Sequence, residues 1–170
     1  MPIFLKSPED KFRFGDYLSG LTDGEGHFSL LLVRYKGRYR FRGRFVITLR
    51  ADDRKVLEMA KEYLGCGIVS YRCRWKKSKD THNPQVVLVV SGGDCISKVI
   101  PHFDAHPLYA KKKKDYRIWR KGMILWDGFR HRSPIFRGGG RGFEFRWTQE
   151  EFEEFKSLCE RLKRVRRFSI

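Results

Sequence analysis

The chain has 170 residues, and its 37 lysines and arginines against 20 acidic residues give a formal net charge of +17. Its 41% hydrophobic and 15% aromatic residues are enough for a packed core, which excludes disorder as the main state. No apolar run approaches the roughly 20 residues that cross a bilayer, and residues 1–11 contain no signal-type apolar region. We therefore expect a soluble intracellular protein, cytoplasmic or nucleoid-associated if prokaryotic, that is neither secreted nor membrane-bound.

The positive charge predicts a polyanionic partner. Each phosphate that a lysine or arginine neutralises releases condensed counterions, so nucleic acid is the leading candidate. An anionic membrane surface is less favoured because no basic amphipathic anchor stands at either end. The four cysteines form no CxxC pair and match neither a zinc site nor a disulfide framework, so reduced thiols are expected.

The first predicted elements are a helix and a hairpin. Ser7 is placed to cap a helix that ends at Gly24 and Gly26. Residues 27–35 and 38–50 follow as two strands joined by a two-residue connection suited to a hairpin.

A second unit of the same kind comes next. A helix closed by Gly65 precedes strands 68–75 and 85–91, and Asp94 is expected to cap a third helix. A fourth helix is predicted over about residues 109–126. The order predicts an α+β fold with an αββαββα core and a four-stranded antiparallel saddle sheet.

The composition changes after Trp126. We expect a core over residues 1–126 and a basic C-terminal extension over residues 127–170, with a flexible loop at residues 138–142. Thr148 opens a capping box before a last helix, whose end is strongly basic. The hypothesis is that this helix contacts flanking phosphates, and unchanged affinity and salt dependence after deletion of residues 148–170 would contradict it.

The informative stretch is residues 18–26, Leu-Ser-Gly-Leu-Thr-Asp-Gly-Glu-Gly. Its small residues permit close approach of a partner helix, while Asp23 and Glu25 place two acids at a helix C-terminus, where the helix dipole disfavours them. A divalent cation would relieve that repulsion. The alternative is that both acids merely form caps or salt bridges.

This stretch resembles the LAGLIDADG signature of homing endonucleases, and the element order resembles that family from residue 7 to about 125. The resemblance implies that Glu25 and the Gly24 carbonyl bind Mg²⁺, with Mn²⁺ possible and Ca²⁺ bound without cleavage. The chain holds one copy of the motif, so the resemblance also implies a homodimer. The expected dimer interface comprises Leu18, Ser19, Gly20, Thr22 and Asp23.

The strands carry the expected DNA-binding residues. Arginines recur at every second position of the second strand, so they share one sheet face, and cations of the third strand repeat the pattern. Such a ribbon fits the major groove of double-stranded DNA. The alternative is an ordinary solvent-exposed sheet face that binds no DNA. The candidates are Ser29, Arg38, Arg40, Arg42, Arg44, Arg72, Arg74 and Lys76. Two such saddles extend about 70 Å, on the order of 20 base pairs, and their symmetry predicts a pseudo-palindromic site.

Two further catalytic candidates come from the resemblance. Lys112, with Lys111 as the fallback, matches a basic residue before the last core helix, where it would stabilise phosphate charge. The alternatives for this lysine run are a solvated face or a localisation tag. Leu49 stands where relatives have a water-positioning glutamine, so Arg50 beside it is the candidate for that polar role.

The histidines are assigned no chemistry. His82-Asn83 lacks the surroundings of a histidine-based nuclease, and His27, His102, His106 and His131 form no triad with cysteine or serine. His27 lies near enough to Glu25 in sequence to line a cleavage centre.

The sequence thus predicts an intron-encoded, homodimeric homing endonuclease that makes a metal-dependent double-strand cut, leaving short 3′ overhangs as that family does. The alternatives are a non-cleaving intron-RNA maturase or DNA-binding protein on the same fold, and a generic RNA-associated basic protein.

Overall fold

The structure is a computed structural model that describes residues 7–35, 38–72, 84–132, 135–137, 143–145 and 147–166. Its helices are α1 (Pro8–Glu25), α2 (Arg54–Leu64), α3 (Ile100–Ala105), α4 (Lys112–Arg130) and α5 (Gln149–Arg166). Its strands are β1 (Gly26–Tyr35), β2 (Arg38–Arg50), β3 (Ile68–Arg72), β4 (Gln85–Ser91), β5 (Ile135–Arg137) and β6 (Phe143–Phe145).

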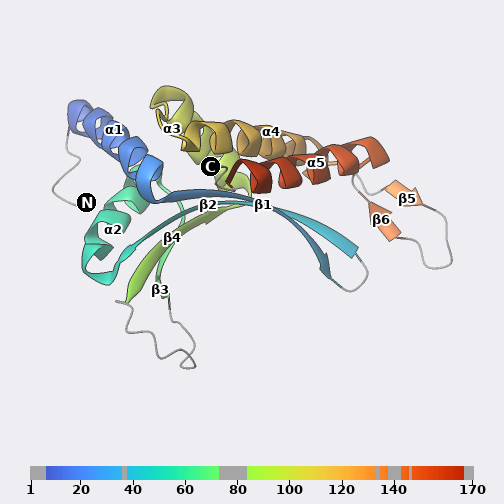
Figure 1. Cartoon of the computed structure of the whole chain (residues 1–170), viewed down its shortest axis with the longest axis horizontal. Coiled ribbons are helices and arrows are strands. Elements are labelled where there is room, and N and C mark those ends of the chain that lie inside the picture. Colours follow the sequence, from blue (N-terminus) through green and yellow to red (C-terminus); the bar gives the residue numbers. More distant parts are fainter. Residues whose placement is uncertain are drawn as a thin grey trace. The chain divides into compact units, whose positions relative to one another are not determined.

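Strands β1 to β4 form one antiparallel sheet in the order β1-β2-β4-β3, and β5 pairs with β6 alone (Figure 1). The predicted α+β class and the repeated αββ order are therefore confirmed. None of the helices in the described ranges combines the length and apolar composition that a bilayer span needs.

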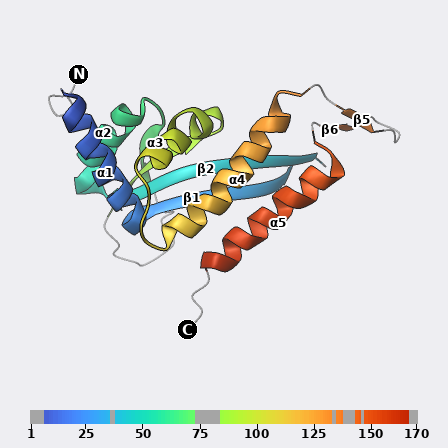
Figure 2. The same cartoon turned by 90° about the horizontal axis from the view of Figure 1, so that it is seen from above.

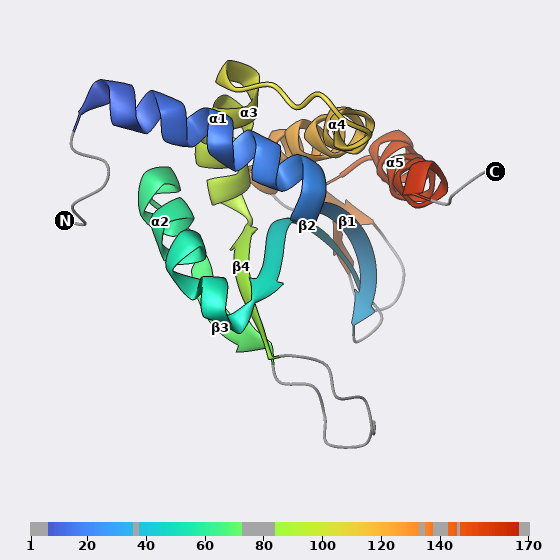
Figure 3. The ribbon, with the colours of Figure 1, turned by 60° about the vertical axis from the view of Figure 1, so that its left-hand side comes forward.

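The chain divides into two compact units, Met1–His27 with Arg44–Lys113 and Phe28–Gly43 with Lys114–Ile170. In the first unit, α1 and α2 lie beside the end of β2 and strands β3 and β4 (Figure 3). Alternate side chains of β2 and β4 enter its core, where the Phe45 ring lies 5.4 Å from that of Phe103. Leu57 and Ala60 of α2 are fully buried.

In the second unit, α4 and α5 run side by side over β1 and the start of β2 (Figure 2). The Phe28 ring lies 5.1 Å from Trp119, and the Phe41 ring lies 4.5 Å from Phe155. A Cβ at Gly122 would come within 2.5 Å of the Leu30 side chain, so glycine is what lets α4 approach β1 this closely.

Most predicted helix ends are confirmed. Ser7 and Asp10 form a capping box at the start of α1, and Thr148 and Glu151 form another at α5. Gly65 closes α2 with a φ of 68°, a left-handed conformation that glycine adopts without strain. Asp94 makes no side-chain capping bond, so that prediction is wrong; the chain there continues into a π-helical turn over Cys95–Val99.

The later part of the chain differs in detail from the prediction. Helix α4 spans Lys112–Arg130 instead of about 109–126, and the amides of Tyr109 and Ala110, which precede it, bond Asp23, as described below. The small β5–β6 pair was not predicted, and the loop at residues 138–142 lies outside the described residues. The compact units are bounded differently from the predicted division at residues 126 and 127, which stays a prediction.

Candidate active site and nucleic-acid interface

The motif helix α1 ends in an exposed acid that has no bonding partner among the described residues. Glu25 is the last residue of α1, its side chain is exposed, and it makes no hydrogen bond or ion pair with any described residue. Gly24 beside it is also exposed, and a Cβ built there would meet nothing within 4 Å. The Glu25 carboxylate is therefore available to a ligand, and Gly24 beside it is an exposed residue.

Asp23, the other acid of the motif, behaves differently. Its Oδ2 accepts hydrogen bonds from the backbone N–H groups of Tyr109, at 2.8 Å, and Ala110, at 3.2 Å. Asp23 is thus engaged in hydrogen bonds within its own chain, whereas Glu25 makes no such bond with the described residues.

The five residues predicted to form a dimer interface are mostly covered by their own chain. Leu18 and Thr22 are fully buried, Ser19 is 5% exposed, and Asp23 is turned to its own loop. Gly20 is exposed, with nothing within 4 Å of a Cβ built on it. Between Tyr17 and Gly24, the exposed residues of α1 are Tyr17, Gly20 and Gly24, which lie along one stripe of the helix.

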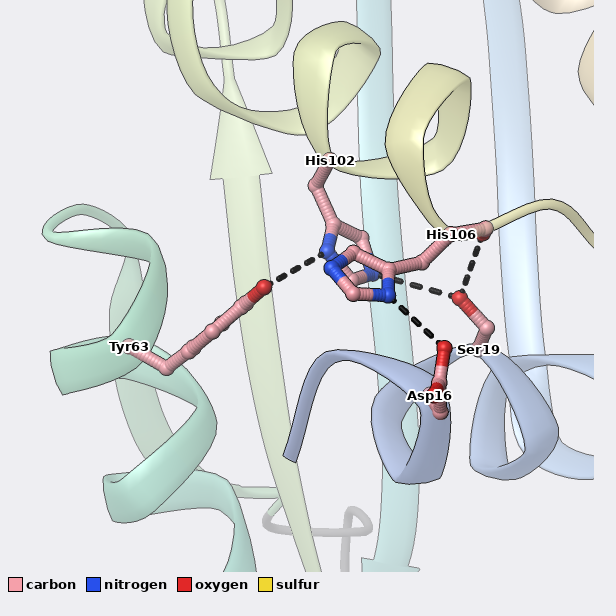
Figure 4. A network of polar contacts seen from close by, with 5 residues as sticks. All are labelled: Asp16, Ser19, Tyr63, His102 and His106. Atoms are coloured by element: carbon pink, nitrogen blue, oxygen red, sulfur yellow. Dashed lines mark hydrogen bonds and ion pairs between the residues drawn. The ribbon is translucent and has the colours of Figure 1, made fainter. Parts of the chain in front are cut away.

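A buried polar network that sequence reasoning missed holds α1 to α3 (Figure 4). The Ser19 hydroxyl donates to the His106 carbonyl at 2.7 Å, and His106 Nδ1 lies 2.8 Å from an Asp16 carboxylate oxygen. The second imidazole, His102, contacts Ser19 Oγ through Nε2 at 3.4 Å and the Tyr63 hydroxyl through Nδ1 at 3.3 Å. Because the Ser19 proton is already donated, these partners fit a neutral His102 with its proton on Nε2.

The network predicts a pH dependence of stability. Burial of the ring, helped by the neighbouring His106, lowers the pKa of His102 from 6.5 to about 4. Between these values the unfolded chain binds a proton that the folded chain does not, so the free energy of unfolding falls as pH drops from 6.5 to 4, by about 3 kcal/mol at most. Urea unfolding at pH 7 and pH 4.5 measures this fall. His102→Gln should reduce it, exposed His131→Gln should not, and an unchanged fall in His102→Gln would contradict the assignment.

The lysine candidates stand where the loop after α3 enters α4. Lys112 is the first residue of α4, half-buried, and makes no hydrogen bond or ion pair with the described residues. Lys111 is exposed and does have an interaction partner. Lys112 is thus the one of these two lysines without a partner among the described residues, and its catalytic role stays a prediction.

The described residues of one chain supply only part of a metal site. They contain no group of three or more histidine, cysteine or acidic side chains that could hold a metal ion. The Glu25 carboxylate and the Gly24 carbonyl are hard oxygen donors of the kind that Mg²⁺ prefers. These two groups fit as oxygen ligands of a divalent cation.

In the second unit, the start of β2 separates a basic face from a buried one. Arg40 and Arg42 are exposed, whereas Phe41 between them is 8% exposed and packs under the helices. Ser29 of β1 is 9% exposed, so little of it is open to a ligand, and the Arg38 side chain lies outside the described set.

In the first unit, strand register defines an open face of the sheet. Arg50 of β2 and Arg72 of β3 both pair with Gln85 of β4, so the three side chains form one cross-strand row. Arg44 is half-buried on that face, and Arg50 also bonds Asp52 at 2.8 Å. Leu49 faces the helices beside Val86, so it cannot replace a water-positioning glutamine there. Arg74 and Lys76 lie outside the described residues.

The register also adds residues that the sequence analysis did not single out. Thr48 and Ser70 both pair with Val87, which puts two hydroxyls on the open face next to the row that contains Gln85. A third row, Val46, Val89 and Ile68, is apolar, and Ile68 is 70% exposed. Hydroxyl, amide and methyl groups can contact base edges in a groove, so this face is more mixed than arginine spacing alone indicated.

The fold, with its motif helix and its basic strand surface, can be compared with known families. The sequence model of a family described as LAGLIDADG endonuclease matches residues 18–123, more than half of the chain. The chain therefore belongs to the LAGLIDADG endonuclease family.

Two relatives are fungal proteins. The probable intron-encoded endonuclease Cox1-I1b of Schizosaccharomyces pombe is 28% identical over 125 residues, which is 73% of this chain and 30% of that protein. The probable intron-encoded DNA endonuclease 1 of Mycosarcoma maydis is 33% identical over 115 residues, 67% of this chain and 38% of that protein. The chain thus spans a minor part of the length of these relatives.

Solved structures show the same fold. The homing endonuclease I-TnaI matches with a TM-score of 0.64 and 25% identity, covering 89% of this chain and 94% of that one. The LAGLIDADG homing endonuclease I-SmaMI bound to cleaved DNA matches with a TM-score of 0.68 and 25% identity, covering 90% of this chain and 45% of that one. Another I-SmaMI structure holds an uncleaved DNA target in the presence of calcium ions.

Proposed function

We propose that this chain is an intron-encoded homing endonuclease that acts as a homodimer and makes a metal-dependent double-strand cut in a long pseudo-palindromic DNA site. The observation that carries the proposal is the open Glu25 carboxylate at the end of the family's motif helix, in a chain of charge +17. A protein that only binds phosphates gains nothing from an unpaired acid there, since the acid repels them.

The residues divide the work of hydrolysis, in which water adds across one P–O bond of each strand. Glu25 and the Gly24 carbonyl would hold Mg²⁺, which when bound activates a water and stabilises the charge on phosphate oxygens. Lys112 is placed to stabilise negative charge on the scissile phosphate. The arginines of the open face, Arg40, Arg42, Arg44 and Arg72, bind the DNA and fix its register. Arg50 stays a weaker candidate for the polar role near water, because it bonds Asp52.

The proposed dimer follows from the incomplete site. Among the described residues, the motif of one chain contributes one acid without a partner, and a two-fold axis through the exposed stripe Tyr17, Gly20 and Gly24 would bring two copies of Glu25 together.

The stripe gives a prediction for Gly20→Leu. The protomer has space for the side chain and leucine is the better helix former by about 1 kcal/mol, so the monomer should fold as well as wild type. At a close two-fold contact the added bulk appears twice, and we expect association to weaken by about 100-fold. Sedimentation over a concentration series measures this. The matched control is Gly128→Leu in α4, whose position is equally open; equal association of Gly20→Leu and wild type would contradict the interface.

The basic end of α5 remains a proposed contact to flanking phosphates. Arg161, Lys163 and Arg164 are exposed. Deleting the helix is a poor test because Phe155, Leu158 and Leu162 are buried in the second unit. Replacing the three cations by alanine should keep the fold and lower the dependence of log affinity on log salt by about one unit per lost phosphate contact. An unchanged salt dependence would remove this helix from the interface.

The function is tested with a plasmid library of candidate sites incubated with the protein in Mg²⁺, in Ca²⁺ or in chelator. We expect linear product in Mg²⁺ only, with both strands cut at one site. Tight binding in Mg²⁺ without any cut would favour the alternative, a non-cleaving DNA-binding protein or intron-RNA maturase, and binding arms with DNA and intron RNA would separate those two.

A further inference from the structure

Two residues of the motif helix α1 form hydrogen bonds with the loop that leads to the candidate lysine, Lys112. The loop runs from His106, at the end of α3, to Lys111, just before α4, and residues 107–110 lie in neither helix nor strand. Ser19 donates to the His106 carbonyl at the start of the loop, and Asp23 accepts from the Tyr109 and Ala110 amides at its end. Four residues apart on a helix, Ser19 and Asp23 project to one side, so a single face of α1 holds both ends of the loop.

The loop has few other attachments. The Tyr109 side chain is 85% exposed, Pro107 and Ala110 are exposed, and only Leu108, at 2% exposure, is buried. The two bonds to Asp23 are therefore the polar contacts that fix the backbone nearest to α4. Hydrogen bonds from N–H groups to a charged acceptor are stronger than those to a neutral one.

Ala110 connects Asp23 to the first turn of α4 through two hydrogen bonds. Its amide bonds Asp23, and its carbonyl accepts from the Lys113 amide at 3.0 Å. Lys112 lies between these contacts, two residues after Ala110, while Glu25 lies two residues after Asp23. The bond between Asp23 and Ala110 thus links the segment that carries the acid to the segment that carries the lysine.

We propose that Asp23 is a positioning residue that sets Lys112 relative to Glu25 by holding the Tyr109 and Ala110 amides. This inference rests on the proposed function, in which both groups act on one phosphate. Asp23 itself acts through the loop, since its Oδ2 is taken by the two amides. A reacting geometry that shifts by about 1 Å can lose on the order of 100-fold in rate.

The test compares Asp23→Ala with Asp23→Asn, whose amide oxygen can still accept both N–H bonds. In single-turnover cleavage with Mg²⁺, we expect Asp23→Ala to be slower by about 10- to 100-fold at unchanged DNA affinity, and Asp23→Asn to recover to within about 5-fold of wild type. Asp94→Ala, which removes an exposed acid elsewhere in the first unit, is the control and should change neither value.

A double mutant separates positioning from mere support of the fold. If Asp23 acts through Lys112, Asp23→Ala should cause little further loss in a Lys112→Ala background. Multiplying effects of the two substitutions would overturn the proposal. So would an Asp23→Asn variant as slow as Asp23→Ala, because the charge and not the acceptor would then be what matters.

Hydrogen exchange gives a readout that needs no cleavage. The Tyr109 and Ala110 amides should exchange faster in Asp23→Ala than in wild type, and Asp23→Asn should restore their protection. If wild type cuts no DNA, the proposed function fails, but hydrogen exchange still tests the contact. Unchanged exchange in Asp23→Ala would show that Asp23 does not hold the loop.

Discussion

Replacing Glu25 by glutamine is expected to lower the single-turnover cleavage rate by about 1,000-fold while DNA affinity stays within about 2-fold of wild type. Glutamine keeps the size of the side chain but offers a neutral oxygen to a divalent cation. The lost charge stabilisation of several kcal/mol corresponds to about this factor in rate. Cleavage is measured at saturating protein in Mg²⁺, and affinity by fluorescence anisotropy in Ca²⁺.

Because Glu25 is exposed, its replacement should affect cleavage without affecting the fold. The side chain is exposed and bonds no described residue, so its replacement removes no contact from the fold. Glu62→Gln, at an exposed position of α2, is a matched control that should cut at the wild-type rate. A Glu25→Gln protein that cuts within about 10-fold of wild type, or that loses affinity in proportion to rate, would remove Glu25 from the catalytic centre.

Local sequence patterns predicted the parts of this protein that depend on neighbouring residues. The period of two over residues 38–50 gave the buried and open faces of β2, because successive side chains of a strand point to opposite sides. The capping box at Thr148 and the glycine after α2 are likewise decided within a few residues. The motif at residues 18–26 named the family that the comparisons confirm.

What the sequence could not predict are contacts between distant residues. Asp23 bonds an amide 86 residues away, and Ser19 bonds a carbonyl 87 residues away. Nothing in the spacing of His102 and His106 indicates that they face α1, since periodicity reports a buried face without naming what covers it. The same limit applies to the open face, where Gln85 joins Arg50 and Arg72 only through the register of β4.

The long-range contacts also change how the motif is understood. From the residues alone, the small and polar positions of α1 were assigned to a partner chain. In the structure Ser19 and Asp23 bond the chain's own loop, and Gly20 and Gly24 stay open. One helix can therefore have three roles, because each uses a different face. It can provide an acid at its end, hydrogen bonds to the loop before Lys112 on one side and a contact surface on another side.

The second large effect is expected from replacing Arg40 and Arg42 together by alanine. Both side chains are exposed on β2, so stability should change by less than about 1 kcal/mol, whereas the proposed dimer loses four cations from its DNA surface. We expect affinity for the target to fall by at least about 100-fold, and the slope of log affinity against log salt to decrease by about four if all four contact phosphates. Titrations at several salt concentrations measure both quantities.

The same titrations distinguish two roles for these arginines. Phosphate contacts would weaken binding to target and to unrelated DNA alike, whereas bidentate contacts to guanine would weaken target binding more, by about 1–3 kcal/mol for each contact. A control that removes the same charge elsewhere, Arg13→Ala with Lys61→Ala on α1 and α2, should have a small effect that high salt abolishes. If this control and the strand variant lose affinity equally, net charge alone drives binding and the open face of β2 is not the DNA surface.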